Sequence, residues 1–178
     1  MDYLAVALIS YIFGSIPFGL ILTKIFLKAD IRNFGSGNIG ATNVIRSGNK
    51  LLGYLTLSLD ILKAVVPVIY IKYNMTDLVY ISALSVFIGH VFPIWLKFKG
   101  GKGVASYVGI LFSLNLIYGL IFGITWIVIF FISRYSSLSS IIGSLSIPIY
   151  LFFSNENQII FFGIMFILIF YTHRENIN

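Results

Sequence analysis

The residues best suited to chemistry in this sequence lie in one short polar stretch, positions 34–46. It contains three glycines, a serine, a threonine, two asparagines and an arginine, whereas 58% of the whole chain is hydrophobic. Glycine lets backbone N–H groups turn toward one point, hydroxyl and amide side chains add hydrogen-bond groups there, and a guanidinium adds a bidentate positive charge. These properties suit a bound phosphate, so the stretch predicts a phosphate-binding loop.

Two other interpretations of the same stretch are weaker. Gly35, Gly37 and Gly40 match the dinucleotide-binding pattern G-x-G-x-x-G, but that pattern has meaning only between a strand and a helix of a βαβ unit. A flexible turn between two helices is the second alternative. A turn alone gives no reason for a serine, a threonine, two asparagines and an arginine to occur together.

A second glycine-rich segment, residues 97–103, carries three lysines and three glycines. Lysines at the edge of a membrane helix commonly contact anionic lipid head groups, and this is the ordinary interpretation. The glycines that flank Lys102 also permit a close backbone approach to a ligand, to which its ammonium group adds a positive charge. The segment lacks the glycine spacing of a Walker A loop and its Ser/Thr after lysine, so nucleotide hydrolysis fits poorly.

The two histidines differ in their surroundings. His90 lies near a glycine and a proline at the expected end of a helix, where a structural role is favoured over a catalytic one. His173 is followed by Arg174, Glu175 and Asn176, which makes it the better candidate for a functional group.

Two further polar groups have both a structural and a functional interpretation. The serine-rich segment 136–140 is expected to cap a helix that follows it, and a capped helix N-terminus also attracts anions. Asp60 and Lys63 lie three residues apart. On a helix they share one face, so they are able to pair inside a helical bundle.

The composition indicates a membrane protein. Charged residues are only 10% of the 178 residues, and the mean hydropathy is +0.97, far above that of soluble domains. The net charge of +6 does not indicate nucleic-acid binding, because the chain has too little polar surface for a basic solvated face. The sequence has no cysteine, which excludes disulfides, an enzyme thioester and a cysteine-based metal site. We expect neither a metal nor a cofactor.

The hydrophobic runs predict an all-α polytopic membrane protein with about seven transmembrane helices. The expected spans are residues 3–27, 51–73, 78–96, 104–112, 116–132, 141–153 and 159–171. The first is interrupted at residues 14–19 by a proline and two glycines, which predicts a kink covered by neighbouring helices. The run 104–132 is too long for one span, so we divide it at residues 113–115 and expect its first half to be short or partly inserted.

Basic residues indicate the orientation of these helices. Four segments, 28–50, 97–103, 134–140 and 172–178, fall on one side of the membrane and hold nine of the twelve basic residues. By the positive-inside rule this side is the cytoplasm, so the N-terminus lies outside and the C-terminus in the cytoplasm. The unusual polar motifs therefore share one face, as a single active site requires. Because no internal repeat or linker is evident, residues 1–178 are expected to form a single integral membrane domain.

With these motifs assembled, the chain resembles the PlsY family, bacterial membrane acyltransferases that use acyl phosphate to acylate glycerol-3-phosphate. The resemblance covers essentially the whole length. It is carried by five motifs in the family's order and approximate spacing, at residues 14–17, 35–43, 89–93, 99–103 and 173–176.

The resemblance implies the reaction and its partners. Acyl phosphate and glycerol-3-phosphate are the expected substrates, in contact with the lipid bilayer. The products are 1-acyl-glycerol-3-phosphate (lysophosphatidic acid) and inorganic phosphate, in the first acylation step of phospholipid biosynthesis. Neither a cofactor nor an obligate protein partner is implied. The implied location is the bacterial cytoplasmic (inner) membrane, where a multi-pass enzyme has its active site facing the cytoplasm.

The resemblance also assigns site residues. Catalysis is expected to involve Lys102, His173 and Asn176. Binding of substrate or phosphate is expected to involve Ser36, Gly37, Asn38, Thr42, Asn43, Arg46, Lys102, Ser137 and Ser140. Within that set, Thr42 and Asn43 hold either the loop or the glycerol hydroxyls. The hypothesised mechanism is direct attack of the glycerol 1-hydroxyl on the acyl carbonyl, with His173, Glu175 or the acceptor's own phosphate as the base.

Two rival classes of protein use similar residues. A transporter of phosphate or organic anions also needs glycines and cations among membrane helices, but it predicts an inverted repeat and polar groups near the bilayer midplane. A purely structural membrane subunit leaves the five motifs unexplained. The one-sided placement of the polar residues favours the acyltransferase.

Overall fold

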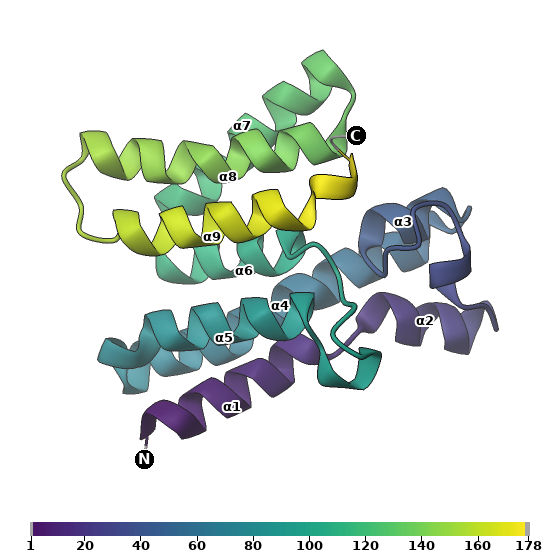
Figure 1. Ribbon diagram of the computed structural model, residues 1–178, viewed down its shortest axis with the longest axis horizontal. Coiled ribbons are helices and arrows are strands. Elements are labelled where there is room, and N and C mark those ends of the chain that lie inside the picture. The colour runs from purple at the N-terminus through teal and green to yellow at the C-terminus, as the bar shows by residue number, and fades with distance from the viewer. Residues whose placement is uncertain (1, 177–178) are drawn as a thin grey trace. The chain divides into compact units, whose positions relative to one another are not determined.

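The computed structural model describes residues 2–176, and all regular secondary structure within this range is helical. This confirms the predicted all-α fold. The α-helices are α1 (Asp2–Ser15), α2 (Phe18–Phe26), α3 (Ala41–Arg46), α4 (Lys50–Asn74), α5 (Val79–Val91), α6 (Val104–Leu114), α7 (Leu116–Ser133), α8 (Ser136–Phe153) and α9 (Ile159–Thr172) (Figure 1). The chain forms two compact units, Met1–Ile110 and Leu111–Asn178, which are described separately.

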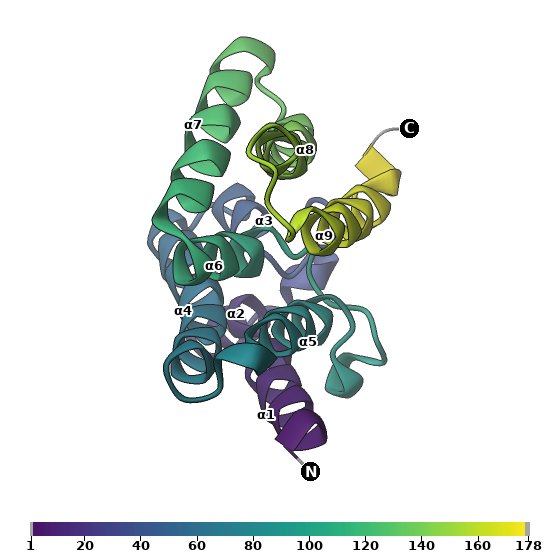
Figure 2. The ribbon, with the colours of Figure 1, turned by 90° about the vertical axis from the view of Figure 1, so that its left-hand side faces the viewer.

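In the first unit, α1 and α4 both pack against α5 (Figure 1 and Figure 2). Two glycines allow α1 and α5 to approach closely, because a Cβ at Gly14 or Gly89 would collide with the backbone of the facing helix. Ser10 and Ser82 form a buried hydrogen bond of 2.8 Å between the same two helices. Small residues and hydroxyl pairs are typical contacts between membrane helices, where lipid supplies no hydrophobic driving force for helix association.

The expected kink is a complete break between α1 and α2. The break takes the carbonyl groups of Ser15 and Ile16 out of the regular helical hydrogen bonding, although Ile16 still accepts the N–H of Phe18 at 3.2 Å. Within a membrane such groups need partners from neighbouring elements. The indole N–H of Trp95 donates to the Ser15 carbonyl at 2.9 Å, and the ammonium group of Lys63 donates to the Ile16 carbonyl at 2.7 Å. Neighbouring elements therefore cover the freed backbone, as the sequence predicted.

The predicted pair of Asp60 and Lys63 is confirmed. Lys63 Nζ lies 2.7 Å from Asp60 Oδ1 within α4, and at most 3% of either side chain is exposed. The same ammonium group lies 5.8 Å from the centre of the Phe18 ring at the start of α2. This one buried cation therefore links α4 to the break between α1 and α2.

The second unit contains α7, α8 and α9, with α8 packed against both of its neighbours. The predicted division of the long apolar run is confirmed, since α6 ends at Leu114 and Asn115 caps α7 by accepting the N–H of Ile117 at 2.9 Å. Tyr118 on α7 donates its hydroxyl to Glu156 Oε2 at 2.5 Å, which fixes the turn between α8 and α9.

The prediction for the serine-rich segment was wrong. Helix α8 begins at Ser136, ahead of the expected residue 141, and its N-cap residue Tyr135 makes no side-chain capping bond. The hydroxyl of Ser139 donates to the Tyr135 carbonyl at 2.8 Å, and that of Ser140 to the Ser136 carbonyl at 2.9 Å. Serine hydroxyls bond back to the preceding turn in this way when they lie inside a helix, so these side chains belong to the helix and do not cap it.

Five helical segments within residues 2–176 are long and apolar enough to cross a membrane. They are Asp2–Phe26, Lys50–Asn74, Thr76–Leu96, Leu116–Ser133 and Ser136–Phe153. Two shorter apolar helices, Val104–Leu114 and Ile159–Thr172, coincide with the remaining predicted spans. The fold class is confirmed, and the count of seven spans and their orientation stay predictions.

Candidate active site

The first glycine-rich stretch forms a compact loop that leads into the short helix α3. A single 3-10 turn, Ile31–Asn33, precedes it. Gly35 and Gly37 have φ angles of +52° and +69°, in the left-handed region that glycine adopts without steric strain. The backbone therefore turns within the loop at glycines, as the sequence predicted.

Asn43 occupies the centre of this loop and is buried. Its Nδ2 group donates to the carbonyl oxygens of Ile31, Phe34 and Asn38 at 3.1, 2.9 and 2.8 Å. Its Oδ1 atom accepts the backbone N–H of Ser36 at 3.0 Å. These contacts support the loop-holding role of Asn43, one of the two roles considered for it.

The other residues predicted on this loop lie nearer its surface. The side chain of Asn38 is half-buried, and its Oδ1 atom accepts the N–H of Gly40 at 2.9 Å. Ser36, Gly37, Thr42 and Arg46 are exposed. The loop thus brings six of the predicted site residues together and leaves four of them open to a ligand.

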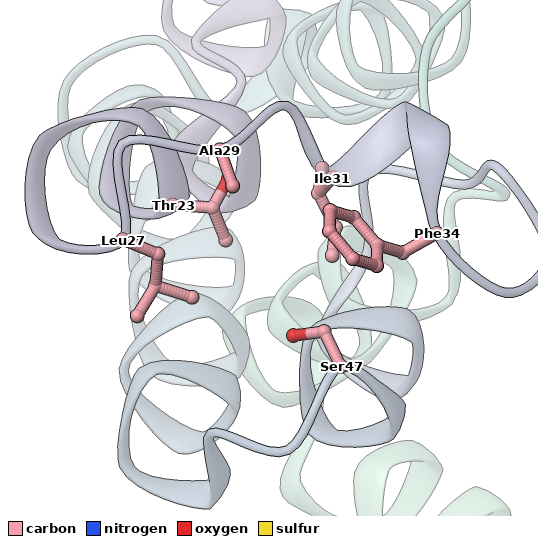
Figure 3. A pocket seen from close by; sticks show the side chains of 6 residues that line it. All are labelled: Thr23, Leu27, Ala29, Ile31, Phe34 and Ser47. Carbon is pink, nitrogen blue, oxygen red and sulfur yellow. The ribbon is translucent and has the colours of Figure 1, made fainter.

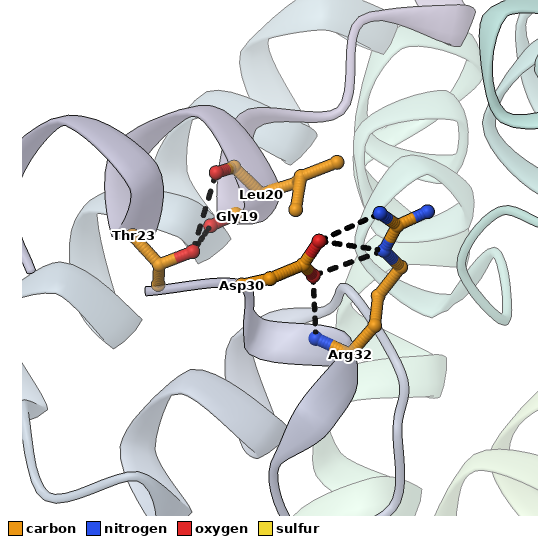
Figure 4. Close-up of polar contacts among 5 residues, drawn as sticks. All are labelled: Gly19, Leu20, Thr23, Asp30 and Arg32. Carbon is orange, nitrogen blue, oxygen red and sulfur yellow. Dashed lines mark hydrogen bonds and ion pairs between the residues drawn. The ribbon is translucent and has the colours of Figure 1, made fainter. Parts of the chain in front are cut away.

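An ion pair anchors the entrance to the loop (Figure 4). Arg32 donates to both carboxylate oxygens of Asp30, with Nη2 lying 2.6 Å from Oδ2. Hydrogen bonds from the Arg32 side chain lower the pKa of the Asp30 carboxyl from 3.8 to about 2, and the same pairing raises the pKa of Arg32. Nearby on α2, Thr23 donates its hydroxyl to the carbonyls of Gly19 and Leu20 at 2.8 and 3.2 Å.

The second glycine-rich segment folds back onto the C-terminal end of α5. The N–H of Gly100 donates to the Val91 carbonyl, and that of Gly101 to the His90 carbonyl, both at 3.0 Å. Lys102, which follows directly, is half-buried.

The glycines of this segment are needed for packing against α5. A Cβ at Gly101 would collide with the buried imidazole of His90, and one at Gly103 with the ring of Phe87. Gly103 also has a φ angle of +88°. The sequence interpretation placed this close approach at a ligand, whereas the contact seen here is with the protein's own helix. The burial of His90 beneath the segment agrees with the structural role favoured for it.

In the second unit, His173 and Asn176 share one turn at the end of α9. His173 is buried, and its Nδ1 atom lies 2.8 Å from the Ile169 carbonyl oxygen. Because a carbonyl only accepts, Nδ1 carries the proton in this contact and Nε2 carries the lone pair in the neutral ring. The N–H of Asn176 donates to the His173 carbonyl at 2.8 Å, closing the turn Arg174–Asn176.

The two predicted serines of α8 differ in burial. Ser140 is buried, and its hydroxyl, which donates to the Ser136 carbonyl, also accepts the indole N–H of Trp126 at 3.1 Å. Ser137 is half-buried. Of the two hydroxyls, that of Ser140 is therefore already engaged on both its donor and its acceptor side.

A small cavity of about 210 Å³ opens beside the first loop (Figure 3). It is lined by Thr23, Leu27, Ala29, Ile31, Phe34 and Ser47. The hydroxyls of Thr23 and Ser47 already donate to backbone carbonyls. The cavity is smaller than the ~300 Å³ at which ligand pockets usually begin, and none of the predicted phosphate-binding residues lines it.

Two supporting residues were missed by the sequence reasoning. Trp95 donates a hydrogen bond to the Ser15 carbonyl at the break after α1, and Phe87 forms the surface on which Gly103 packs. Neither carries a signal in a sequence, because both act through partners distant along the chain. Within the described range 2–176, no three histidine, cysteine or acidic residues lie together in a way that would hold a metal ion.

The long apolar helices and the polar loops between them define a polytopic integral membrane protein. A family profile described as glycerol-3-phosphate acyltransferase matches residues 4–178. The chain belongs to the glycerol-3-phosphate acyltransferase family and is an enzyme of that class.

Relatives and solved structures agree with this family. The glycerol-3-phosphate acyltransferase of Pelagibacter ubique (strain HTCC1062) is 69% identical, covering 100% of this chain and 93% of the relative. That of Rhodopseudomonas palustris (strain HaA2) is 47% identical, covering 99% and 90%. Crystal structures of PlsY (YgiH), an integral membrane glycerol 3-phosphate acyltransferase, are 36% identical and cover 100% of this chain and 91% of theirs. TM-scores are 0.94 for the glycerol 3-phosphate form and 0.91 for the lysophosphatidic acid form. The resemblance to PlsY is confirmed.

Proposed function

We propose that this enzyme transfers a fatty acyl group from acyl phosphate to the 1-hydroxyl of glycerol-3-phosphate. The products are 1-acyl-glycerol-3-phosphate and inorganic phosphate, in the first acylation step of phospholipid biosynthesis. The observation that carries the proposal is the loop built around buried Asn43, which leaves Ser36 and Arg46 exposed in a member of this family.

The substrates carry two phosphates with different tasks. One leaves from the acyl donor, and the other orients the acceptor. We assign Ser36, Asn38, Arg46 and Lys102 to phosphate binding, because hydroxyl, amide and cationic groups supply the hydrogen bonds and charge that a phosphate needs. Gly37, whose N–H donates to the Phe34 carbonyl at 2.9 Å, provides a left-handed turn in the loop. Asn43 holds the loop, and exposed Thr42 is assigned to the glycerol hydroxyls. Ser137 or Ser140, His173 and Asn176 are the other site residues that we propose.

The proposed reaction is a single displacement at the acyl carbon. The glycerol 1-hydroxyl oxygen forms the new C–O bond to the acyl carbon, and the bond from that carbon to the phosphate oxygen breaks. The phosphate leaves with the electron pair, and the hydroxyl proton passes to a base. An acyl phosphate is already activated, so no covalent enzyme intermediate is needed. Positioned cations and amide donors stabilise the charge on the carbonyl oxygen.

We take His173 as the first candidate for the base. Its Nδ1 proton faces the Ile169 carbonyl, so Nε2 is the nitrogen whose lone pair takes up a proton. Glu175 and the acceptor's own phosphate are the alternatives. A His173→Gln variant that loses the acid limb of the pH–rate profile supports the histidine, and one that keeps this limb supports the acceptor phosphate or Glu175.

The proposed location is the bacterial cytoplasmic membrane, with the active site facing the cytoplasm and the N-terminus outside. The one-sided distribution of basic residues supports this orientation. We further propose that residues 1–178 act as a single domain, which is supported by one family profile that covers residues 4–178.

Release of inorganic phosphate tests the function. The purified protein is given palmitoyl phosphate and glycerol-3-phosphate. Palmitoyl-CoA is tested as an alternative donor by formation of 1-acyl-glycerol-3-phosphate, because its transfer releases CoA and no phosphate. We expect phosphate release only when both substrates are present and a fall of about 100-fold or more in Lys102→Ala, as for lost transition-state contacts. Lys99→Ala is the matched control on the same segment, because a general lipid anchor would depend on both lysines. Binding of glycerol-3-phosphate without any acyl transfer would instead favour a transporter.

A further inference from the structure

A buried cluster of ionisable side chains lies beneath the Lys102 segment, and the reaction just described does not use it. Asp60 Oδ1 lies 2.7 Å from Lys63 Nζ and 3.9 Å from Nδ1 of His90. No more than 3% of any of these three side chains is exposed. Well-packed apolar residues of similar volume generally stabilise a fold as well as a buried ion pair does. Ionisable residues within membrane helices are therefore treated as functional by default.

The cluster reaches Lys102 through a continuous set of contacts. The carbonyl of His90 accepts the N–H of Gly101, and the His90 imidazole lies so close beneath Gly101 that a Cβ there would collide with it. Lys102 is the next residue along the chain. On the opposite side, Lys63 donates to the Ile16 carbonyl at the break between α1 and α2. The cluster thus joins α4, the α1–α2 break and the glycine-rich segment.

We infer that Asp60, Lys63 and His90 are positioning residues that set the place of Lys102. The contact of 3.9 Å between Asp60 and His90 is too long for a hydrogen bond, so the carboxylate acts on the imidazole through its charge. The imidazole is confined between this carboxylate and the backbone at Gly101, and its rotation would displace the segment. None of the three residues is assigned a contact with substrate, because their side chains are buried. The inference rests on the proposed phosphate-binding role of Lys102.

A double-mutant cycle gives the kinetic test. His90→Gln is expected to lower kcat/KM by about 10–100-fold, the loss typical of a slightly misplaced catalytic group. In a Lys102→Ala background the same change is expected to cost less than about twofold, because its effect passes through Lys102. The paired change Asp60→Leu with Lys63→Met removes both charges together. It is also expected to lower kcat/KM when Lys102 is present and to have little effect in the Lys102→Ala background. Equal losses with and without Lys102, or no loss in folded variants, would overturn the inference.

Hydrogen exchange gives a readout that does not depend on activity. We expect faster exchange of the Gly100 and Gly101 amides in His90→Gln, with unchanged exchange in α9. The control is Ser10→Ala with Ser82→Ala, which removes another buried polar pair from the same unit and leaves exchange at both glycines unchanged.

A wild type without acyl transfer refutes the proposed function, whereas unchanged exchange in the variant refutes the positioning role. If His90→Gln fails to fold, Gly101→Ala replaces it, because the added Cβ disturbs the contact between Gly101 and the His90 imidazole. The same loss of kcat/KM through Lys102 and the same faster amide exchange are then expected of Gly101→Ala.

Discussion

At the scale of single residues, Asn43 shows why an amide is suited to the centre of the loop. Asparagine offers two N–H donors and one acceptor oxygen in the same side chain. Donation to three carbonyls and acceptance from Ser36 fix the loop from both directions. The shape of the loop therefore depends on a buried group, while exposed Ser36 and Arg46 are left to bind a ligand.

Replacing Asn43 with aspartate tests whether the loop depends on this amide. Asn43→Asp keeps an acceptor for the Ser36 N–H but turns anionic oxygen toward three carbonyls. Because buried groups left unsatisfied cost about 1–3 kcal/mol each, we expect the free energy of unfolding to fall by about 3 kcal/mol or more, with loss of acyl transfer. Thermal unfolding in detergent measures the first quantity and phosphate release the second.

Asn49→Asp is the matched control for Asn43→Asp. Asn49 caps α4 through its Oδ1 atom, and aspartate caps a helix equally well, so stability is expected to be unchanged. Equal melting temperatures for Asn43→Asp and the wild type would contradict the central role of Asn43.

At the scale of elements, the contact between α1 and α5 depends on the absence of side chains at two positions. A Cβ at Gly14 would overlap the carbonyl group of Val86. The obstacle is backbone, which does not move aside as the end of a flexible side chain would. The two helices would have to separate, and the Ser10–Ser82 hydrogen bond lies in the same interface.

Gly14→Ala is therefore expected to destabilise the enzyme by about 2 kcal/mol or more, although alanine favours a helix by about 1 kcal/mol over glycine. Gly163→Ala on α9 is the control, because among residues 2–176 no atom beyond the local helix backbone lies within 4 Å of the added Cβ there. It should be neutral or slightly stabilising. The melting temperatures of the two variants are compared. Similar values would show that α1 and α5 can separate at little cost in stability.

Elements with a local signal were predictable, and contacts between distant elements were not. Pro17 marked the break after α1 and Asn115 the start of α7, because each acts on the backbone beside it. The start of α8 was predicted too late because serine suits both a cap and a helix whose hydroxyls bond to the previous turn. The sequence indicated that the glycines around Lys102 serve a close approach. It could not indicate that these glycines pack against His90 and Phe87, since this depends on how α5 packs.

At the scale of the whole molecule, the seven-span topology is testable because the chain has no cysteine of its own. With seven spans, the cysteine of Asn157→Cys lies on the non-cytoplasmic side of the membrane, and with only the five long spans it lies in the cytoplasm. We expect a membrane-impermeant maleimide to label Asn157→Cys in intact bacteria. Asp77→Cys should be labelled under either count and Lys99→Cys under neither, because both precede α6. Protection of Asn157→Cys in intact cells with labelling after lysis would favour five spans.

The broken first helix also has a consequence for biosynthesis. The Lys63 partner of the Ile16 carbonyl follows it by 47 residues, and the Trp95 partner of the Ser15 carbonyl follows it by 80. A ribosome delivers the chain from its N-terminus, so the first helix reaches the bilayer before either partner does. The break is completed only when the helices α4 and α5 and the turn that carries Trp95 have emerged. The earliest segment to be made is thus among the last to reach its final hydrogen bonding.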